Sequence, residues 1–433
     1  MVIVGLHIDK EDFVQEIGNS DLFVYPVYAD ADLHPVHNQL SFIFVKNIKT
    51  LKEYVIGDNH YDCVPETLDV NNTLFIYNKK QLLHTSQHVI STARIENALD
   101  AKYFVHYHTN IKLNDIEESD TVSWYTRNSA VTVNHIPVLK LISHINTEFH
   151  TFKSTYDVNP IDDMYVKYDM MLCRALGFVE SSGVETTHGR LFTNYNVYTK
   201  TGRPSNAFGG INFSALKKDG DRRESFISRF DRNGFLVQLD FKAYHPRLLS
   251  RLVGYNIDMN IDVYDFLAKQ YFNKTEVTAD EIADAKGITF LQIYGGVRDE
   301  YKHIPFFKAI IEYTEQLWSI FQRDGYITTP IFKRKLHKEF YDNIKPATLL
   351  NYLIQAFETE RNIILINIIR DYIIKHEKQS KLLLYTYDSL LIDFHKRDGW
   401  GFIEHMRTTM CQDYYPMSVY IGYNYKDMMR KNI

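Results

Sequence analysis

The chain has 433 residues, of which 45% are hydrophobic and 24% are charged, so it can form two or three globular domains. Its formal net charge of −5 excludes a protein that is basic throughout, and any nucleic-acid site must be a local basic patch. No apolar run reaches the ~18 residues of a membrane-spanning helix, and no secretory signal is present. The widely spaced Cys63, Cys173 and Cys411 indicate a reducing compartment. These features predict a soluble cytoplasmic protein without a membrane partner.

The N-terminal part of the chain predicts strands followed by a helix. Residues 20–46 indicate two strands around a polar turn, and residues 73–78 indicate another strand. Residues 161–183 have helical spacing and end in ESSG, which is a stop signal for a helix.

The C-terminal part predicts a sheet that presents acids, with helices inserted between its strands. From residue 186 onward, Thr, Asn and Gly indicate short strands and exposed loops. GFLVQLDF, residues 234–241, is an apolar strand that ends on an acid, and MSVYIGYNY predicts the last strand. The fold class is therefore α+β. Helical periodicity covers residues 262–271, 279–294, 305–324 and 346–375.

Two acids interrupt or end apolar strands. Asp240 ends LVQLD, and Asp388 stands in the middle of LLLYTYDSLLIDF. Asp388 alone suits a hairpin turn, and each acid could be a solvated strand end. If the fold brings them together, they repel unless a divalent cation lies between them. Mg²⁺ prefers one or two carboxylates, waters and substrate phosphates, so the pair is a candidate metal site.

A helical segment between these acids combines a cation with aromatic residues. In ADAKGITFLQIYGG, Lys286, Phe290 and Tyr294 follow at i, i+4 and i+8 on one helix face, and Gly295 comes next. Lys can hold a triphosphate, the aromatic rings can stack on a base and a sugar, and Gly allows close approach. The alternative is an amphipathic helix with its aromatic stripe in the core, which explains the rings but not the Lys.

Polar and basic segments offer further candidate nucleic-acid contacts. Asn351 and Gln355 are an i, i+4 pair whose amides can contact the minor-groove acceptors common to all base pairs. Basic residues cluster at 217–232 and at 332–338, where Arg334 lies, and can bind phosphates. Each of these features could instead be a solvated face.

The order of these motifs resembles the family A DNA polymerases over roughly residues 186–433. DFKAYHPRLL resembles motif A, KGITFLQIYGG resembles motif B, and TYDSLL resembles motif C. GRLFTNYNVYTKTGRPS is similar to the family strand that ends in Thr-Gly-Arg, and the Asn351 and Gln355 spacing matches its Asn-x-x-x-Gln helix. GYITTPIFKRK resembles a basic segment that follows the fingers. The resemblance implies an antiparallel palm sheet with helical fingers.

The resemblance also implies roles for single residues. Asp240, Asp388 and the Phe241 carbonyl would bind two Mg²⁺ ions, with Mn²⁺ as an alternative, and Lys286 would neutralise the triphosphate and protonate the leaving pyrophosphate. The implied dNTP-binding residues are His245, Tyr264, Lys286, Phe290 and Tyr294. The implied primer-template contacts are Arg203, Arg247, Gly295, Arg334, Asn351, Gln355 and Tyr387.

Several positions depart from the family pattern. His245 replaces the usual Glu that blocks a ribose 2′-hydroxyl, and motif C has Tyr387 and Ser389 in place of His and Glu. Ile282 replaces a motif B Arg, and Tyr264 replaces a phosphate-binding His. Lys242 or Arg298 could supply the missing triphosphate contact.

The family places a proofreading exonuclease before the polymerase, and here that region looks degenerate. Pro26 and Tyr28 stand where an Asp-x-Glu pair is expected, and Leu82 stands where another Asp is expected. Asp169 alone fits, which predicts a domain without exonuclease activity. Asp30 and Asp32 are the nearby acids that could compensate.

These comparisons predict a domain order. Residues 1–160 form a degenerate α/β RNase H-like exonuclease-type domain, 161–190 a reduced thumb or connector, and 191–433 the palm and fingers, with the fingers at about 258–330. A reduced thumb implies low processivity or a partner protein.

The function implied is a template-directed DNA polymerase, encoded by a phage or virus and located in the host cytoplasm, that adds dNTPs to a primer. Two alternatives stay open: a polymerase or primase that uses ribonucleotides, and a non-catalytic nucleic-acid-binding protein derived from a polymerase.

Overall fold

The structure is a computed structural model that describes residues 2–3, 7–28, 33–38, 40–57, 72–85, 92–113, 136–412 and 414–431. The chain divides into two compact units, unit 1 at Met1–Ser181 and unit 2 at Ser182–Ile433. In the described part, no helix is both long and apolar enough to cross a membrane. The expected connector at 161–190 is divided between the two units, because its helix belongs to unit 1.

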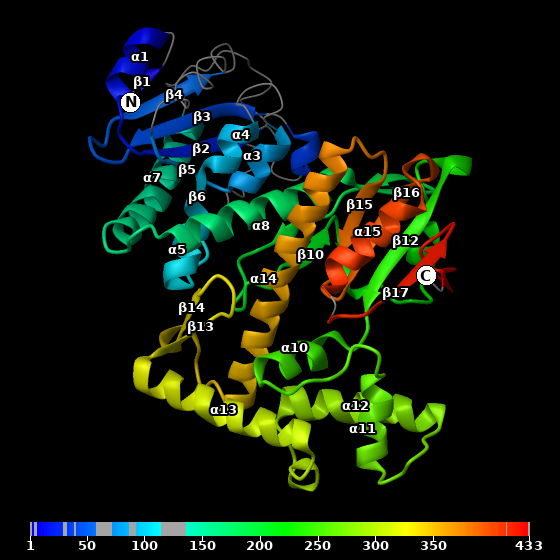
Figure 1. The fold of residues 1–433 in the computed structure, drawn as a ribbon. Coiled ribbons are helices and arrows are strands. Elements are labelled where there is room, and N and C mark those ends of the chain that lie inside the picture. Colours follow the sequence, from blue (N-terminus) through cyan, green and yellow to red (C-terminus); the bar gives the residue numbers. More distant parts are fainter. Residues whose placement is uncertain are drawn as a thin grey trace. The chain divides into compact units, whose positions relative to one another are not determined.

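Unit 1 is built on a mixed sheet in the order β1-β4-β3-β2-β5-β6 (Figure 1). β2, β3 and β4 are antiparallel, whereas β5 pairs parallel to β2 and to β6. This arrangement agrees with the expected α/β domain, and the strands expected within 20–46 and 73–78 are confirmed. The strands are β1 (Val2–Ile3), β2 (Leu22–Tyr28), β3 (Leu40–Asn47), β4 (Glu53–Gly57), β5 (Leu74–Ile76) and β6 (Leu99–Asp100).

Helices cover both faces of this sheet. On one face, Phe23 of β2 packs its ring against Phe149 and Phe152 of α7. On the other face, Val24 of β2 shares a core with Leu82 of α3. Burial from both sides explains why β2 is apolar without alternation. The helices of unit 1 are α1 (Lys10–Ile17), α3 (Lys79–Thr85), α4 (Thr92–Asn97), α5 (Ala101–Thr109), α7 (Ile136–Tyr156) and α8 (Asp163–Ser182), with a 3₁₀ turn at Pro35–His37.

The one acid that fits the exonuclease pattern is neutralised by a lysine. Asp169 of α8 is buried, and its Oδ2 accepts hydrogen bonds from Lys79 Nζ at 2.6 Å and from the Asp100 amide at 3.3 Å. Burial alone would lower the pKa of Lys79, but Asp169, Cys173 and Asp100 together outweigh burial and raise that pKa. Leu82 is buried in α3 beside this network. Asp30 and Asp32 lie outside the described residues.

Unit 2 contains the expected antiparallel palm sheet, in the order β15-β16-β12-β17-β18. β12 is central and pairs with β16 on one side and with β17 on the other. It is the predicted strand at 234–241, and it is buried along most of its length because α14 and α15 cover the sheet. The strands are β12 (Gly234–Phe241), β15 (Lys381–Tyr385), β16 (Ser389–His395), β17 (Met417–Gly422) and β18 (Met429–Lys431).

The four helices predicted from periodicity in unit 2 are confirmed within one residue at each end. Three of them form the fingers region expected at about 258–330, and the fourth, α14, runs from these helices to the palm (Figure 1). Thr278 begins α12 with a capping box, because its hydroxyl accepts from the Glu281 amide and Glu281 accepts from the Thr278 amide. The helices are α10 (Tyr244–Leu252), α11 (Val263–Tyr271), α12 (Ala279–Gly295), α13 (Pro305–Asp324), α14 (Pro346–Lys375) and α15 (Trp400–Cys411), with the short α9 at Asp221–Ser225.

Short strands and loops complete unit 2, as the Thr, Asn and Gly content after residue 186 indicates. They form two-stranded and three-stranded sheets that are separate from the palm sheet. These strands are β7 (Val184–Thr186), β8 (Gly189–Leu191), β9 (Tyr195–Asn196), β10 (Ser205–Phe208), β11 (Ile211–Asn212), β13 (Tyr326–Thr328) and β14 (Lys335–His337).

Candidate active site

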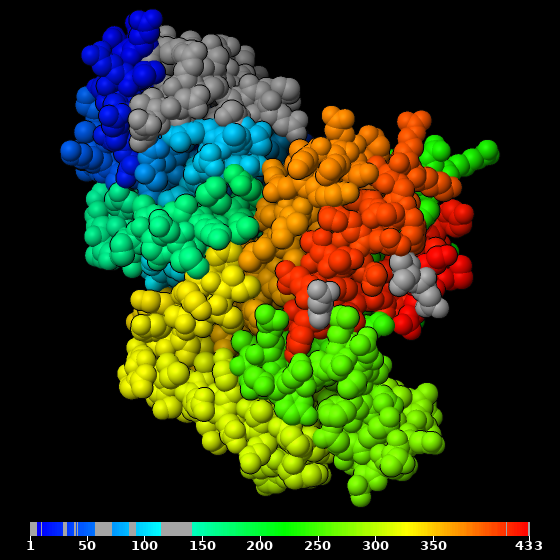
Figure 2. All heavy atoms as spheres, in the orientation of Figure 1, coloured from blue at the N-terminus to red at the C-terminus, as the bar shows by residue number. Residues whose placement is uncertain are grey.

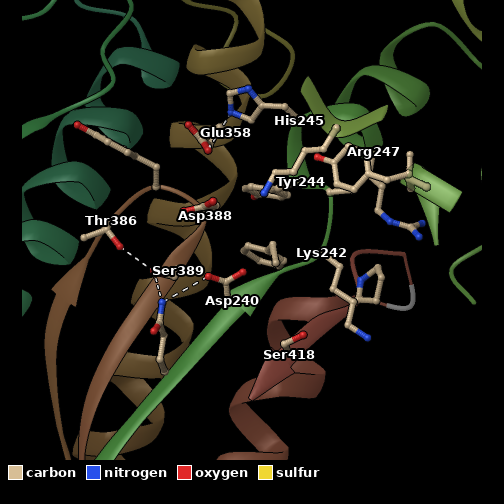
Figure 3. A pocket seen from close by; sticks show the side chains of 18 of the residues that line it. Asp240, Lys242, Tyr244, His245, Arg247, Glu358, Thr386, Asp388, Ser389 and Ser418 are labelled. Carbon is tan, nitrogen blue, oxygen red and sulfur yellow. Dashed lines mark hydrogen bonds and ion pairs between the residues drawn. The ribbon is translucent and has the colours of Figure 1, made fainter. Parts of the chain in front are cut away.

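A cavity of about 650 Å³ opens above the end of β12, and all of its lining residues belong to unit 2. The palm strands supply Asp240 and Asp388, and the fingers helices supply Lys286, Phe290 and Tyr294. Figure 3 shows the palm side of this cavity with the two aspartates close together. The fold therefore joins residues that lie far apart in the sequence.

The register of the palm sheet places the two aspartates side by side. Asp240 pairs across the sheet with Ser389, and the Phe241 amide donates to the Asp388 carbonyl at 2.9 Å. Asp388 follows Tyr387, whose φ of 66° reverses the chain between β15 and β16. The hairpin interpretation of this segment is thus confirmed by the geometry, and its interpretation as a metal ligand stays a prediction.

The electrostatics of the aspartates favour a bound cation. Burial and the neighbouring Asp388 raise the pKa of Asp240 to about 6, and burial and Glu358 raise the pKa of Asp388. Two adjacent carboxylates whose charged forms are disfavoured fit a divalent cation, which would relieve both effects. Phe241 also lines the cavity, so its carbonyl stays a predicted ligand. Within the described residues, no group of three or more His, Cys, Asp or Glu gathers as a larger metal site.

The aromatic stripe of α12 faces the cavity instead of the core. Phe290 and Tyr294 stack with their ring centres 5.7 Å apart, and Tyr294 is 37% exposed. Lys286 Nζ lies 5.9 Å from the centre of the Phe290 ring and 5.9 Å from that of Tyr264. Tyr264, the expected replacement for a phosphate-binding His, therefore belongs to the same wall. Other residues of α12 are buried, namely Ala285, Thr289, Gln292 and Ile293.

His245 is held between a tyrosine and a buried acid. Its Nδ1 lies 2.6 Å from the Tyr294 hydroxyl, and its Nε2 lies 3.1 Å from Glu358 Oε1. Glu358 is fully buried, and its other oxygen lies 2.9 Å from Arg203 Nε. Because a carboxylate can only accept, Nε2 carries the proton and Nδ1 accepts from Tyr294. Glu358 thus fixes the tautomer and the orientation of His245.

Glu358 and Asn362 are site residues that the sequence analysis missed. Asn362 Nδ2 donates to the Tyr387 carbonyl at 2.7 Å, which ties α14 to the hairpin that carries Asp388. Both residues continue the helix face of Asn351 and Gln355, at i+7 and i+11 from Asn351. This polar stripe, in which polar residues recur on one face of the helix, was the signal that could have revealed them.

The expected primer-template residues fall into two groups. Arg203 and Tyr387 line the cavity, with the guanidinium carbon 3.6 Å from the centre of the tyrosine ring. Outside the cavity, Gln355 Nε2 donates to Asn351 Oδ1 at 3.1 Å, and its Oε1 accepts from Thr201 at 3.2 Å. Gly295 ends α12, and a Cβ added there would meet nothing within 4 Å, so the backbone is open to close approach.

Two expected DNA contacts, Arg247 and Arg334, hold the protein's own backbone. Arg247 is 1% exposed and donates to the carbonyls of Asp258, Met259 and Ile261, although it also borders the cavity. Arg334 is 6% exposed and donates to the Thr201 carbonyl. A Cβ at Gly202 would lie 2.3 Å from the Arg334 guanidinium, so Gly202 is needed for this contact. Neither arginine presents a free surface to DNA in this structure.

Basic residues surround the cavity mouth. Lys218 and Arg223 from the expected basic segment 217–232 line it, as does Lys242 after β12. Of the two candidates for the missing motif B contact, Lys242 lines the cavity and Arg298 does not. Ile282 does not line it either.

The architecture resembles that of a known enzyme domain, whereas the sequence has no detectable relatives among curated proteins. No protein-family model and no curated protein matches the chain. Among solved structures, the chain is similar to the POL domain of Pol1 from M. smegmatis, in complex with a DNA primer-template and a dNTP. The likeness covers 96% of this chain and 98% of that chain, with a TM-score of 0.71 and 13% sequence identity. This chain has the fold of a DNA polymerase domain. The fold implied by the resemblance to family A polymerases is thereby confirmed.

Proposed function

We propose that the chain is a template-directed DNA polymerase that adds dNTPs to a primer 3′ end by a two-metal-ion mechanism. The observation that supports this most directly is the cavity in which Asp240 and Asp388 face Lys286 in a polymerase fold. Its expected partners are a primer-template and dNTPs, the molecules bound to the similar Pol1 domain.

Asp240, Asp388 and the Phe241 carbonyl would hold Mg²⁺, or Mn²⁺ as an alternative. When bound, the ions would activate the primer 3′-hydroxyl and stabilise the leaving pyrophosphate. Lys286 supplies a positive charge for the triphosphate and a proton for the leaving group. Phe290, Tyr264 and Tyr294 provide stacking surfaces for the incoming nucleotide, and His245 borders its sugar.

Arg203 and Gln355 are proposed to contact the minor groove at the primer end. Tyr387 supports this assignment, because its ring stacks under Arg203 beside Asp388. Asn351 orients the Gln355 amide through their hydrogen bond. Gly295 would face the template base. For Arg247 and Arg334, the buried contacts favour a structural role.

The decisive experiment is primer extension with the whole chain and with Asp388→Asn. Because Asn keeps the shape but removes a metal-binding charge, we expect extension to fall at least 100-fold. Asp371→Asn, on the exposed end of α14, is the matched control and should extend normally. Equal extension by wild type and Asp388→Asn would refute the metal assignment.

Ribonucleotide use is a second candidate, favoured by His245 at a position where the family has Glu. Extension with dNTPs and with NTPs separates the two activities. A non-catalytic nucleic-acid-binding protein is distinguished by Mg²⁺-dependent dNTP binding, which it would lack.

We also propose that the chain has little processivity of its own. Only Gly183 separates the end of α8 at Ser182 from the start of β7 at Val184, so no helical thumb fits at that point. A polymerase that does not enclose its product duplex would dissociate often or depend on a partner protein.

A further inference from the structure

A second cavity, of about 470 Å³, lies beside the candidate active site at the edge of the palm sheet. It is formed by the residue after Asp240-Phe241, by α15, and by the paired strands β17 and β18. We call it the basic pocket. Its lining residues are Lys242, Arg407, Met417, Ser418, Val419, Arg430 and Lys431.

All the charged residues that line the basic pocket are positive. None of Lys242, Arg407, Arg430 and Lys431 forms an ion pair with a carboxylate in the part of the chain that the structure describes. Arg407 Nε is buried and has no hydrogen-bond partner. An unpartnered buried donor costs about 1–3 kcal/mol. Four cations that repel one another and one unsatisfied donor together fit a polyanionic ligand with several phosphate oxygens.

The basic pocket borders the active-site cavity. Lys242, Ser418 and Arg430 line both cavities. Ser418 is the cross-strand partner of Asp240, and the Lys242 amide donates to the Pro416 carbonyl at 2.8 Å. Figure 3 shows Lys242 on the Ser418 side of Asp240, away from Thr386. In Figure 2, the C-terminal residues in red adjoin the green segment that follows β12.

This position separates the basic pocket from the hairpin that carries Asp388. β17 and β16 flank β12 on opposite sides, so the pocket lies on the far side of Asp240 from that hairpin. A small anion released beside Asp240 can therefore reach the pocket past Lys242, without crossing the place where Arg203 and Tyr387 lie.

We propose that the basic pocket binds inorganic pyrophosphate as it leaves the active site, a role that rests on the proposed polymerase function. In nucleotidyl transfer, the primer 3′-oxygen forms a bond to the α-phosphorus, and the bond from that phosphorus to the bridging oxygen of the β-phosphate breaks. The bond's electron pair stays on the pyrophosphate, and the hydroxyl proton passes to solvent. Lys242 and Arg430, which border both cavities, guide the anion, and Arg407 and Lys431 hold it.

The test measures pyrophosphate binding and its kinetic effect on the whole chain. The variants are Arg407→Gln and Lys431→Gln, which line only the basic pocket. Lys431 is exposed, so its substitution does not threaten folding. Lys375→Gln, at the exposed end of α14, is the control with the same charge change.

We expect calorimetry without Mg²⁺ to show pyrophosphate binding at least five-fold weaker for Arg407→Gln and two-fold weaker for Lys431→Gln. In primer extension, the inhibition constant of pyrophosphate should rise by similar factors, while Lys375→Gln matches wild type. Wild-type affinity for pyrophosphate in both pocket variants would overturn the proposal. Weaker DNA binding with unchanged pyrophosphate affinity would also overturn it and would assign the pocket to a nucleic-acid strand.

These outcomes distinguish failure of the pocket proposal from failure of the proposed polymerase function. If the chain extends no primer but Arg407→Gln still weakens pyrophosphate binding, the polymerase function fails and the anion site stands. If primer extension is robust and neither substitution changes the affinity for pyrophosphate, only the pocket proposal fails.

Discussion

At the scale of single residues, the two aspartates lower the free energy of unfolding of the metal-free protein at neutral pH. The pKa of Asp240 is raised from 3.8 to about 6, so the folded chain binds more protons than the unfolded chain between these values. The free energy of unfolding therefore falls as pH rises from about 4 to 6, and it stays lower at neutral pH. This rise in the pKa of Asp240 corresponds to at most roughly 3 kcal/mol in the free energy of unfolding.

Asp240→Asn should therefore stabilise the metal-free protein at pH 7, by up to about 3 kcal/mol, and should give no gain below pH ~4. Urea denaturation in EDTA across this pH range measures the difference. Saturating Mg²⁺ should reduce the difference in unfolding free energy between Asp240→Asn and wild type, because the ion binds and stabilises the folded wild type. A gain that is independent of pH would contradict this account, and Asp371→Asn should show none.

Glu358 illustrates what a single sequence does not reveal. The polar stripe of α14 marks Glu358 as a candidate, but its role depends on His245 and Arg203, which lie more than a hundred residues away in the sequence. Asp240, Asp388 and Lys286 could be proposed from the sequence because Asp240 is in an apolar strand, Asp388 lies in the turn between two such strands, and Lys286 shares a helix face with two aromatic residues. Arg247 and Arg334 stay predicted DNA contacts, but both are buried and bind carbonyls of this chain, which the sequence cannot distinguish from an exposed arginine.

Glu358→Gln should reduce discrimination between dNTPs and NTPs by about ten-fold, or ~1.4 kcal/mol. An amide can donate as well as accept, so it no longer fixes the tautomer of His245 beside the sugar. The ratio of kcat/KM values for dNTP and NTP is the measurement, and general instability affects both equally. Glu312→Gln, on the exposed side of α13, is the control. An unchanged ratio would exclude this positioning role.

At the scale of elements, periodicity predicted the long helices and the central strands closely. It succeeded because α11, α12 and α13 each bury part of their surface, α14 has a long buried middle, and β12 and β16 are mostly apolar. β18 was missed because its three residues, Met429–Lys431, are all exposed and form no apolar run, and only pairing with β17 defines the strand. Hydrogen bonds between distant segments leave no such pattern in the sequence.

α3 and α8 are joined by a buried ion cluster. Glu180 accepts from Lys80 Nζ at 2.5 Å and lies 2.8 Å from His84 Nε2. Burial would raise the pKa of Glu180, but Lys80 and His84 lower it to about 2. Its stabilising contribution is therefore complete above the ordinary value of 4.5 and is lost as pH falls from 4.5 to about 2.

Glu180→Gln should destabilise unit 1 by roughly 3–5 kcal/mol at pH 7, because it removes the counter-charge of two buried groups. Urea unfolding monitored at pH 7 and pH 3 is the measurement, and the difference from wild type should shrink at the lower pH. Glu404→Gln, exposed on α15, should cost almost nothing. An equally small effect of Glu180→Gln would show that the cluster is not stabilising.

At the scale of the whole molecule, the fold class could be predicted, and the boundary between the two compact units lies within the connector expected at 161–190. The expected boundary followed motif positions, whereas the structural boundary at Ser181 and Ser182 follows packing, since α8 buries its apolar face in unit 1. Motif spacing records which residues act together, but packing depends on faces that only the three-dimensional structure brings into contact.

We expect the chain to remove no nucleotides from a mismatched primer 3′ end. Lys79 occupies the polar centre of unit 1 between Asp100 and Asp169, and an ammonium group at that place excludes a metal ion. A labelled mismatched primer incubated with Mg²⁺ and no dNTPs should keep its length over hours, while a matched primer is extended once dNTPs are added. Shortening that persists in Asp388→Asn would reveal a second nuclease centre.

α14 has a consequence for how this chain can evolve. Asn351, Gln355, Glu358 and Asn362 share one face over about 16 Å, at a rise of ~1.5 Å per residue. Inserting or deleting one residue among them would rotate every later position by about 100° and move the hairpin contact away from the proposed primer contact. This helix can therefore tolerate exchange of amino acids but not a change of length, and its spacing should be the most durable mark by which distant descendants of this chain can be found.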